Sequence, residues 1–159
     1  MKNQEKVSIS VRNLVEFIMR SGDIDNRGGS HDPDAMQEGS RLHRKIQKSM
    51  DASYRPEVTL KHEIPVQCDD EEFVLEIEGR ADGIFCGTPV NPESEEETIT
   101  VIDEIKTTYM DTGHMEKPAG VHRAQAMCYA YIYACKNGLK QIGIQMTYCQ
   151  LETELINRF

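Results

Sequence analysis

The run from Thr98 to Thr108, TITVIDEIKTT, constrains the fold most, because it alternates in the way that a half-buried strand requires. Every second side chain of a strand faces the same way, so Ile102, Glu104 and Lys106 are predicted to share one face. A carboxylate and an ammonium two residues apart can then reach one small volume. The intervening residues are predicted to face the other way: Val101, Asp103 and Ile105.

A second strand-like run, LEIEGRADGIF from Leu75 to Phe85, also carries acidic groups. Its alternation predicts one face with Glu78, Arg80 and Asp82. If the two runs form a hairpin, Asp82 lies beside Glu104. Two carboxylates and a lysine in one place suit a divalent cation and a phosphodiester. A solvated sheet face carries the same residue types, and the triplet by itself leaves both interpretations open.

Composition places the chain among ordinary globular proteins. Its 159 residues, 38% hydrophobic and 28% charged, predict a single domain over residues 1–159. The sequence shows no apolar run of the ~20 residues that a membrane span needs, and no secretory signal, so we expect a cytoplasmic location and no membrane partner. The net charge of -9 argues against tight, non-specific DNA binding by this domain alone.

Apolar spacing predicts the order α-α-β-β-β-α-β, a mixed α/β (α+β) fold with a central sheet of about four strands flanked by helices. The helices are predicted at Val11–Arg20, from Asp32 to about Met50, and at Val121–Asn137. The strands are predicted at Val58–Gln67, Phe73–Phe85, Ile99–Thr107 and Gln141–Cys149, and residues 151–159 as a short tail.

The second predicted helix carries a histidine on its inner stripe. That stripe is predicted to hold Met36, Gly39, His43, Ile46 and Met50. His43 is either a core histidine with its hydrogen bonds satisfied or a ligand, and Gly39 allows another backbone or a substrate to approach closely. The outer side is predicted to be basic, as a solvated face or a track for phosphates: Arg41, Arg44, Lys45 and Lys48.

Four short motifs follow one another on the expected elements. They are GSRLH from Gly39 to His43, GRAD from Gly79 to Asp82, EIK from Glu104 to Lys106, and Gln125-x-x-x-Tyr129. This ordered set, over about residues 36–149, resembles the PD-(D/E)XK nuclease superfamily and within it the RecB-type exonucleases. The resemblance implies a restriction-endonuclease-like core.

The resemblance also implies an activity. It implies a Mg²⁺- or Mn²⁺-dependent deoxyribonuclease, an exonuclease, that hydrolyses DNA phosphodiester bonds in repair or recombination. Its implied partner is DNA, and a helicase domain or subunit if the chain is a module of a helicase–nuclease.

Residue roles come from the same resemblance. Asp82 and Glu104 would hold the metal, with the backbone carbonyl of Ile105 and with His43 as a further ligand or a neighbour of the ligands. Glu104 stands where aspartate is commoner in the family.

Three further residues are implied in catalysis. Lys106 would position or deprotonate the attacking water or stabilise the transition state, and Gln125 and Tyr129 would orient Lys106 and contact the substrate. Two other readings stay open: a DNA-binding or scaffolding module of the same fold without catalysis, and an acidic domain unrelated to nucleic acids.

Overall fold

The computed structural model describes residues 5–20, 33–88 and 98–159. Its mixed α/β class agrees with the sequence prediction. In these ranges a six-stranded sheet has the order β1-β3-β4-β5-β6, with β2 paired to β3. The elements are β1 (Glu5–Ser10), α1 (Val11–Ile18), α2 (Pro33–Ser49), β2 (Arg55–Cys68), β3 (Glu71–Gly87), β4 (Ile99–Thr108), the 3-10 helix η1 (Thr112–His114), α3 (Gly120–Asn137), β5 (Gly143–Gln150) and β6 (Ile156–Arg158).

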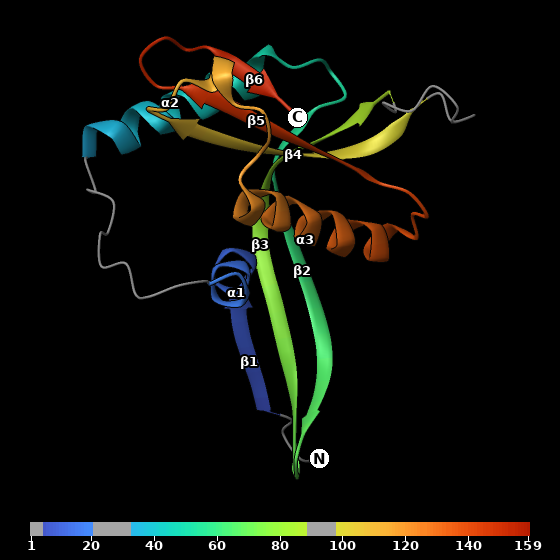
Figure 1. The fold of residues 1–159 in the computed structure, drawn as a ribbon. Coiled ribbons are helices and arrows are strands. Elements are labelled where there is room, and N and C mark those ends of the chain that lie inside the picture. Colours follow the sequence, from blue (N-terminus) through green and yellow to red (C-terminus); the bar gives the residue numbers. More distant parts are fainter. Residues whose placement is uncertain (1–4, 21–32, 89–97) are drawn as a thin grey trace.

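The long strand β3 belongs to both parts of the sheet. It pairs with β2 in antiparallel fashion over most of its length, and with β1 in parallel over Phe73–Glu78. Its last residues, Gly83–Gly87, pair with β4 instead. β4 continues in parallel to β5, and β6 closes the edge in antiparallel fashion. In Figure 1, β1, β2 and β3 form a long arm below α3, and β4, β5 and β6 lie across its upper end.

The predicted number of strands was too low, because β1 and β6 were missed. Residues 5–10 were not predicted as a strand, and the partners of β1 lie 68 residues further along the chain at Phe73–Glu78. β6 has three residues and lies in the segment that was predicted as a tail. Short edge strands receive their stability from a distant partner, which a local pattern does not display.

The helices cover opposite faces of the sheet. On one face α1 and α3 pack against β2, β3 and β4 through residues such as Val15, Ile102 and Ile132. On the other face α2 packs against β4 and β5 through Leu42 and Ile105, among others. Because Ile102 and Ile105 lie in different clusters, the predicted alternation of β4 is confirmed.

The predicted inner stripe of α2 was partly wrong. Met36 is 64% exposed, whereas Leu42, which the prediction left out, is 1% exposed. The buried residues of α2 are Gly39, Leu42 and Ile46, so His43 lies on the flank of the stripe. α2 begins at Pro33 in the structure, and the predicted start at Asp32 lies outside the described residues. In the described parts of the chain, no helix has the length and apolarity to cross a lipid bilayer.

A buried carboxylate joins the strands on the α2 face. Asp103 is 0% exposed and accepts hydrogen bonds from Tyr54 Oη at 2.9 Å and Thr147 Oγ1 at 2.7 Å. Gln145 Nε2 donates a third at 3.2 Å. Tyr54 reaches Asp103 across Gly83, where a Cβ atom would lie only 2.0 Å from the tyrosine ring and hydroxyl.

We predict that Tyr54→Phe destabilises the protein by about 1–3 kcal/mol, because it leaves a buried carboxylate oxygen without its donor. The free energy of unfolding in urea measures this loss. Tyr133→Phe is the matched control, because Tyr133 accepts its hydrogen bond from the exposed Arg55, and we expect a change within about 0.5 kcal/mol. Equal losses in the two variants would contradict the proposed role of the Asp103 network.

Candidate functional site

The site lies where β3 leaves β4. Pairing of the two strands runs from Gly87–Ile99 to Gly83–Asp103 and ends there. Beyond this point the backbone N–H of Ile105 donates to Asp82 Oδ2 at 2.7 Å. The Asp82 carboxylate therefore substitutes for a backbone acceptor and is fixed beside the segment of β4 that carries Glu104.

The pairing of β2 with β3 is also interrupted at this level. It passes from Pro56–Gly83 to Val58–Ala81, and Glu57 between them has φ 56°. The Glu57 carboxylate pairs with Arg80 at 2.6 Å and accepts a hydrogen bond from Gln47 of α2 at 2.9 Å. Asp82 thus lies in a local distortion of both ladders, of the kind that often occurs next to functional sites.

His43 approaches Asp82 from α2. Its Nδ1 lies 3.7 Å from Asp82 Oδ1, and its side chain is 27% exposed. This approach depends on Gly39, one turn earlier, where a Cβ atom would lie 2.9 Å from Thr107 Oγ1 of β4. A neighbour thus lies close to Gly39, but it is the Thr107 side chain of β4 and not the backbone or substrate that was predicted.

Lys106 is held from the other face of the sheet. Its Nζ lies 2.7 Å from Glu104 Oε1 and 3.3 Å from Gln125 Oε1 of α3. Gln125 Nε2 in turn donates to Tyr129 Oη at 3.4 Å. Tyr129 is 3% exposed, so it supports Gln125 rather than lining a cavity.

Gly79 of the GRAD motif is what lets Tyr129 pack on β3. A Cβ atom at Gly79 would lie 2.7 Å from Tyr129 Cε1. We call the point where β3 and β4 separate, just beyond the Gly83–Asp103 pair, the β3–β4 fork. All of the predicted site residues lie near this fork. Asp82 and Ile105 are at the fork itself, His43 lies on one side, and on the other side lie Glu104, Lys106, Gln125 and Tyr129.

Burial makes Glu104 an unusual acid. The residue is 2% exposed, and this burial raises the pKa of its carboxyl to about 7, with the charge of nearby Asp82 acting in the same direction and Lys106 opposing both. Burial also raises the pKa of Asp82. Glu104 Oε2 has no hydrogen-bond partner among the described residues.

A buried carboxylate oxygen without a donor, close to a second carboxylate, fits a divalent cation. Mg²⁺ binds through one or two carboxylates and completes its shell with water, so Asp82 and Glu104 are a sufficient protein contribution. In the described residues, no group of three or more His, Cys, Asp or Glu side chains is arranged to hold a metal ion by itself. The fit therefore rests on the two carboxylates.

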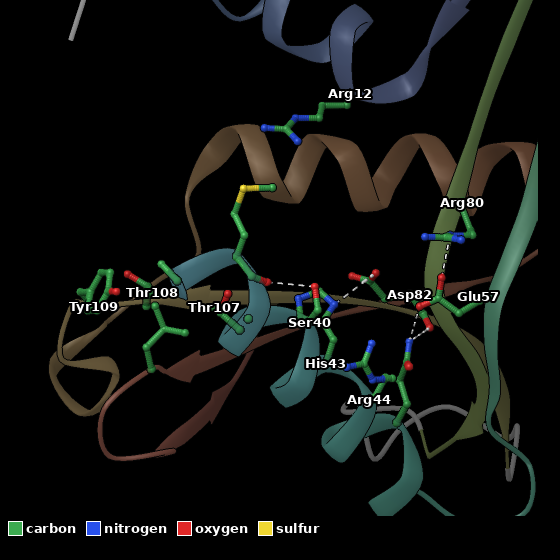
Figure 2. A pocket seen from close by; sticks show the side chains of 15 residues that line it. Arg12, Ser40, His43, Arg44, Glu57, Arg80, Asp82, Thr107, Thr108 and Tyr109 are labelled. Carbon is green, nitrogen blue, oxygen red and sulfur yellow. Dashed lines mark hydrogen bonds and ion pairs between the residues drawn. The ribbon is translucent and has the colours of Figure 1, made fainter. Parts of the chain in front are cut away.

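A cavity of about 1000 Å³ opens beside Asp82 and His43. Three arginines line it, Arg12 from α1, Arg44 from α2 and Arg80 from β3 (Figure 2). Glu57, which is paired with Arg80, and Asp82 also line the cavity, so the lining has a small excess of positive charge on a chain of net charge -9. Of the four basic residues predicted as a phosphate track, only Arg44 lines this cavity.

Two others of the predicted track are engaged elsewhere, because Arg41 and Lys45 both pair with Glu154. Arg12 and Glu57 were missed as site residues in the sequence. Arg12 precedes His43 by 31 residues and lies on another helix, so no local motif connects the two. What distinguishes Glu57 is its positive φ angle, which the sequence does not show.

Comparison with known proteins supports the fold but not a function. No protein-family model and no curated protein matches the chain. A solved structure described as "Crystal structure of SSO0001" is similar, with a TM-score of 0.56 and 19% sequence identity over 98% of this chain and 67% of that chain. At this identity the likeness concerns the fold alone.

The raised pKa of Glu104 predicts a pH-dependent stability of the metal-free protein. Between the ordinary carboxyl pKa of 4.5 and about 7 the folded state holds a proton that the unfolded chain has lost. The contribution of Glu104 to stability is therefore fully present below pH 4.5 and is lost as the pH rises through 7, by about 3 kcal/mol. Glu104→Gln should remove this contribution and leave that of Asp82, so the variant should lose less stability than the wild type between pH 4.5 and 8, as measured by urea unfolding in EDTA.

The exposed Glu152→Gln is the matched control and should keep the pH dependence of the wild type. If Glu104→Gln and the wild type lose the same stability between the two pH values, Glu104 is not the titrating group.

Proposed function

We propose that this chain is a metal-dependent deoxyribonuclease with a restriction-endonuclease-like core. The observation that carries the proposal is the convergence at the β3–β4 fork. There, the buried carboxylate of Glu104 and the partly buried carboxylate of Asp82 lie near Lys106, and one oxygen of Glu104 has no hydrogen-bond partner among the described residues. Metal-assisted phosphodiester hydrolysis uses this combination of ligands and positive charge.

The roles of the side chains follow from their contacts. Asp82 and Glu104 would hold Mg²⁺ or Mn²⁺, with His43 and the Ile105 carbonyl beside them. When bound, the ion supplies a nucleophilic water at neutral pH and neutralises developing negative charge. Lys106, held by Glu104 and Gln125, keeps its ammonium at the same place and stabilises the charge that develops on the phosphoryl oxygens.

DNA as the substrate is supported by the cavity beside Asp82. Guanidinium groups are good phosphate donors, and Arg44 and Arg80 lie on the walls of this cavity (Figure 2). The overall negative charge is consistent with a module whose grip on DNA is completed by another domain or subunit, such as a helicase. Exonucleolytic action in repair or recombination is the form that the resemblance to RecB-type enzymes supports.

The decisive assay measures the release of nucleotides from end-labelled linear DNA with Mg²⁺ or Mn²⁺. We expect cleavage by the wild type and a loss of at least about 100-fold in rate for Lys106→Ala and for Glu104→Ala. Lys136→Ala, an exposed lysine in the last turn of α3, is the control and should cleave normally. Activity that survives both site substitutions would refute the assignment.

The same assay tests the alternative function. A wild-type protein that binds DNA and leaves it intact with either metal is a non-catalytic DNA-binding or scaffolding module of this fold.

Metal binding has its own test. Calorimetric titration with Mn²⁺ should show binding to the wild type and at least a tenfold loss of affinity in Asp82→Asn, because half of the carboxylate charge is removed. Asp70→Asn, an exposed site in the turn between β2 and β3, should bind as the wild type does. Absence of any Mn²⁺ binding by the wild type would favour an acidic domain unrelated to nucleic acids.

A further inference from the structure

A second, smaller cavity lies on the α3 side of Lys106. Its volume is about 330 Å³, and its polar lining comes from α1, α2, β4 and α3. The groups that matter are Arg12, Glu16, Lys106, His122 and Gln125. Arg12 and His43 line both cavities, so the smaller one is next to the larger one.

The contacts of His122 favour one tautomer of its ring. Tyr148 Oη accepts from the backbone N–H of Ala119 at 3.0 Å and lies 2.9 Å from His122 Nδ1. We assign the tautomer in which the Tyr148 hydroxyl both accepts from Ala119 and donates to Nδ1, because this uses the donor and the acceptor of the hydroxyl. The proton of the neutral ring is then on Nε2.

His122 stays neutral over the physiological range of pH. Burial lowers its pKa to about 4, and the positive charges of Lys106 and Arg12 act in the same direction while Glu16 opposes them. The ring thus offers an N–H donor, Nε2–H, that does not depend on protonation. No acceptor for Nε2 occurs among the hydrogen bonds of the described residues.

The other groups make the cavity suited to an anion. Arg12 donates from Nε to Glu16 at 2.9 Å, and a guanidinium has four further N–H groups on its terminal nitrogens. Glu16 is the one acid of the lining and is held by this pair. The cavity also adjoins the start of α3, whose N-cap residue Ala119 makes no side-chain hydrogen bond, so the positive end of the helix dipole acts there.

We propose that this second cavity binds one phosphate group of the DNA strand, with His122 Nε2–H and the Arg12 guanidinium as donors, next to the phosphate that is cleaved at Glu104 and Lys106. This inference rests on the proposed function. Phosphate accepts several hydrogen bonds at once, which matches a neutral donor and a charged donor on two walls of one cavity. The phosphate is either an internal phosphodiester or the terminal phosphate of the strand.

Binding in EDTA separates this subsite from catalysis. Fluorescence anisotropy with a labelled oligothymidylate measures affinity for the wild type, His122→Ala and Arg12→Gln, and each variant should bind roughly tenfold more weakly. Arg12 is exposed on α1, so its substitution leaves folding intact, and thermal melting checks His122→Ala. His114→Ala and Arg123→Gln, both exposed and outside the cavity lining, are the matched controls.

The salt dependence distinguishes the two donors. Arg12→Gln removes a charge and should reduce the slope of log affinity against log salt by about 0.7 for a single strand. His122→Ala removes a neutral donor and should leave that slope unchanged. A defect in the fold would change both the affinity and the salt slope in both variants. A slope that changes only in Arg12→Gln therefore reports the specific contacts.

Neutralising one phosphate at a time locates the group that is bound. A methylphosphonate at a single linkage, or removal of the 5′ or 3′ terminal phosphate, should weaken binding by the wild type at one position and have no further effect there on His122→Ala. The position tells an internal phosphodiester from a terminal phosphate. If every position gives the same losses in variant and wild type, or if both variants bind like the wild type, the inference is overturned.

The experiments distinguish a failure of the proposed nuclease function from a failure of the phosphate subsite. A wild type that binds no DNA overturns the nuclease and this subsite together. A wild type that cleaves with Mn²⁺ while the two variants bind and cleave normally overturns the subsite alone.

Discussion

The hydrogen bond from the Ile105 N–H to Asp82 Oδ2 is the interaction on which the site depends. A backbone donor that no longer has a strand partner must find another acceptor, because burying it unpaired is costly. Asp82 meets that need, and in doing so it is fixed next to Glu104 at the point where β3 turns from β4 into the long arm with β2 (Figure 1). The fork therefore makes one carboxylate both a structural cap and a candidate ligand.

Two glycines allow the helices to pack closely against the strands at this site. Gly39 lets α2 approach Thr107 and so brings His43 to Asp82, while Gly79 lets Tyr129 of α3 pack on β3 and support Gln125. The two faces of one strand are thereby used for different purposes. Asp103, on the α2 face of β4, is paired with Tyr54 and Thr147, whereas Glu104, on the α3 face, retains an oxygen without a donor. Neighbouring acids in the sequence are thus a structural group and a candidate catalytic group.

The proposed function needs basic groups near the site despite the negative total charge of the chain. Acidic residues on the surface neutralise some of the basic ones, as Glu154 does for Arg41 and Lys45, while Arg12 and Arg44 line the cavities near the fork. Burial raises the pKa of Glu104 and of Asp82, because it disfavours their charged forms. A whole-chain charge count hides this local pattern.

The sequence alone determined the alternation of β4, the helix positions and the ordered motifs, because these follow from local periodicity and backbone preference. It left the pairing register of β3 and β4 open, so it placed Asp82 beside Glu104 only on the condition that the two runs form a hairpin. Only the tertiary structure decided that β1 and β6 complete the sheet, that Leu42 rather than Met36 is buried, and that Arg12, Glu57 and His122 surround the site. These features arise from contacts between segments far apart in the chain, whose free energy comes from packing and pairing that no local pattern encodes.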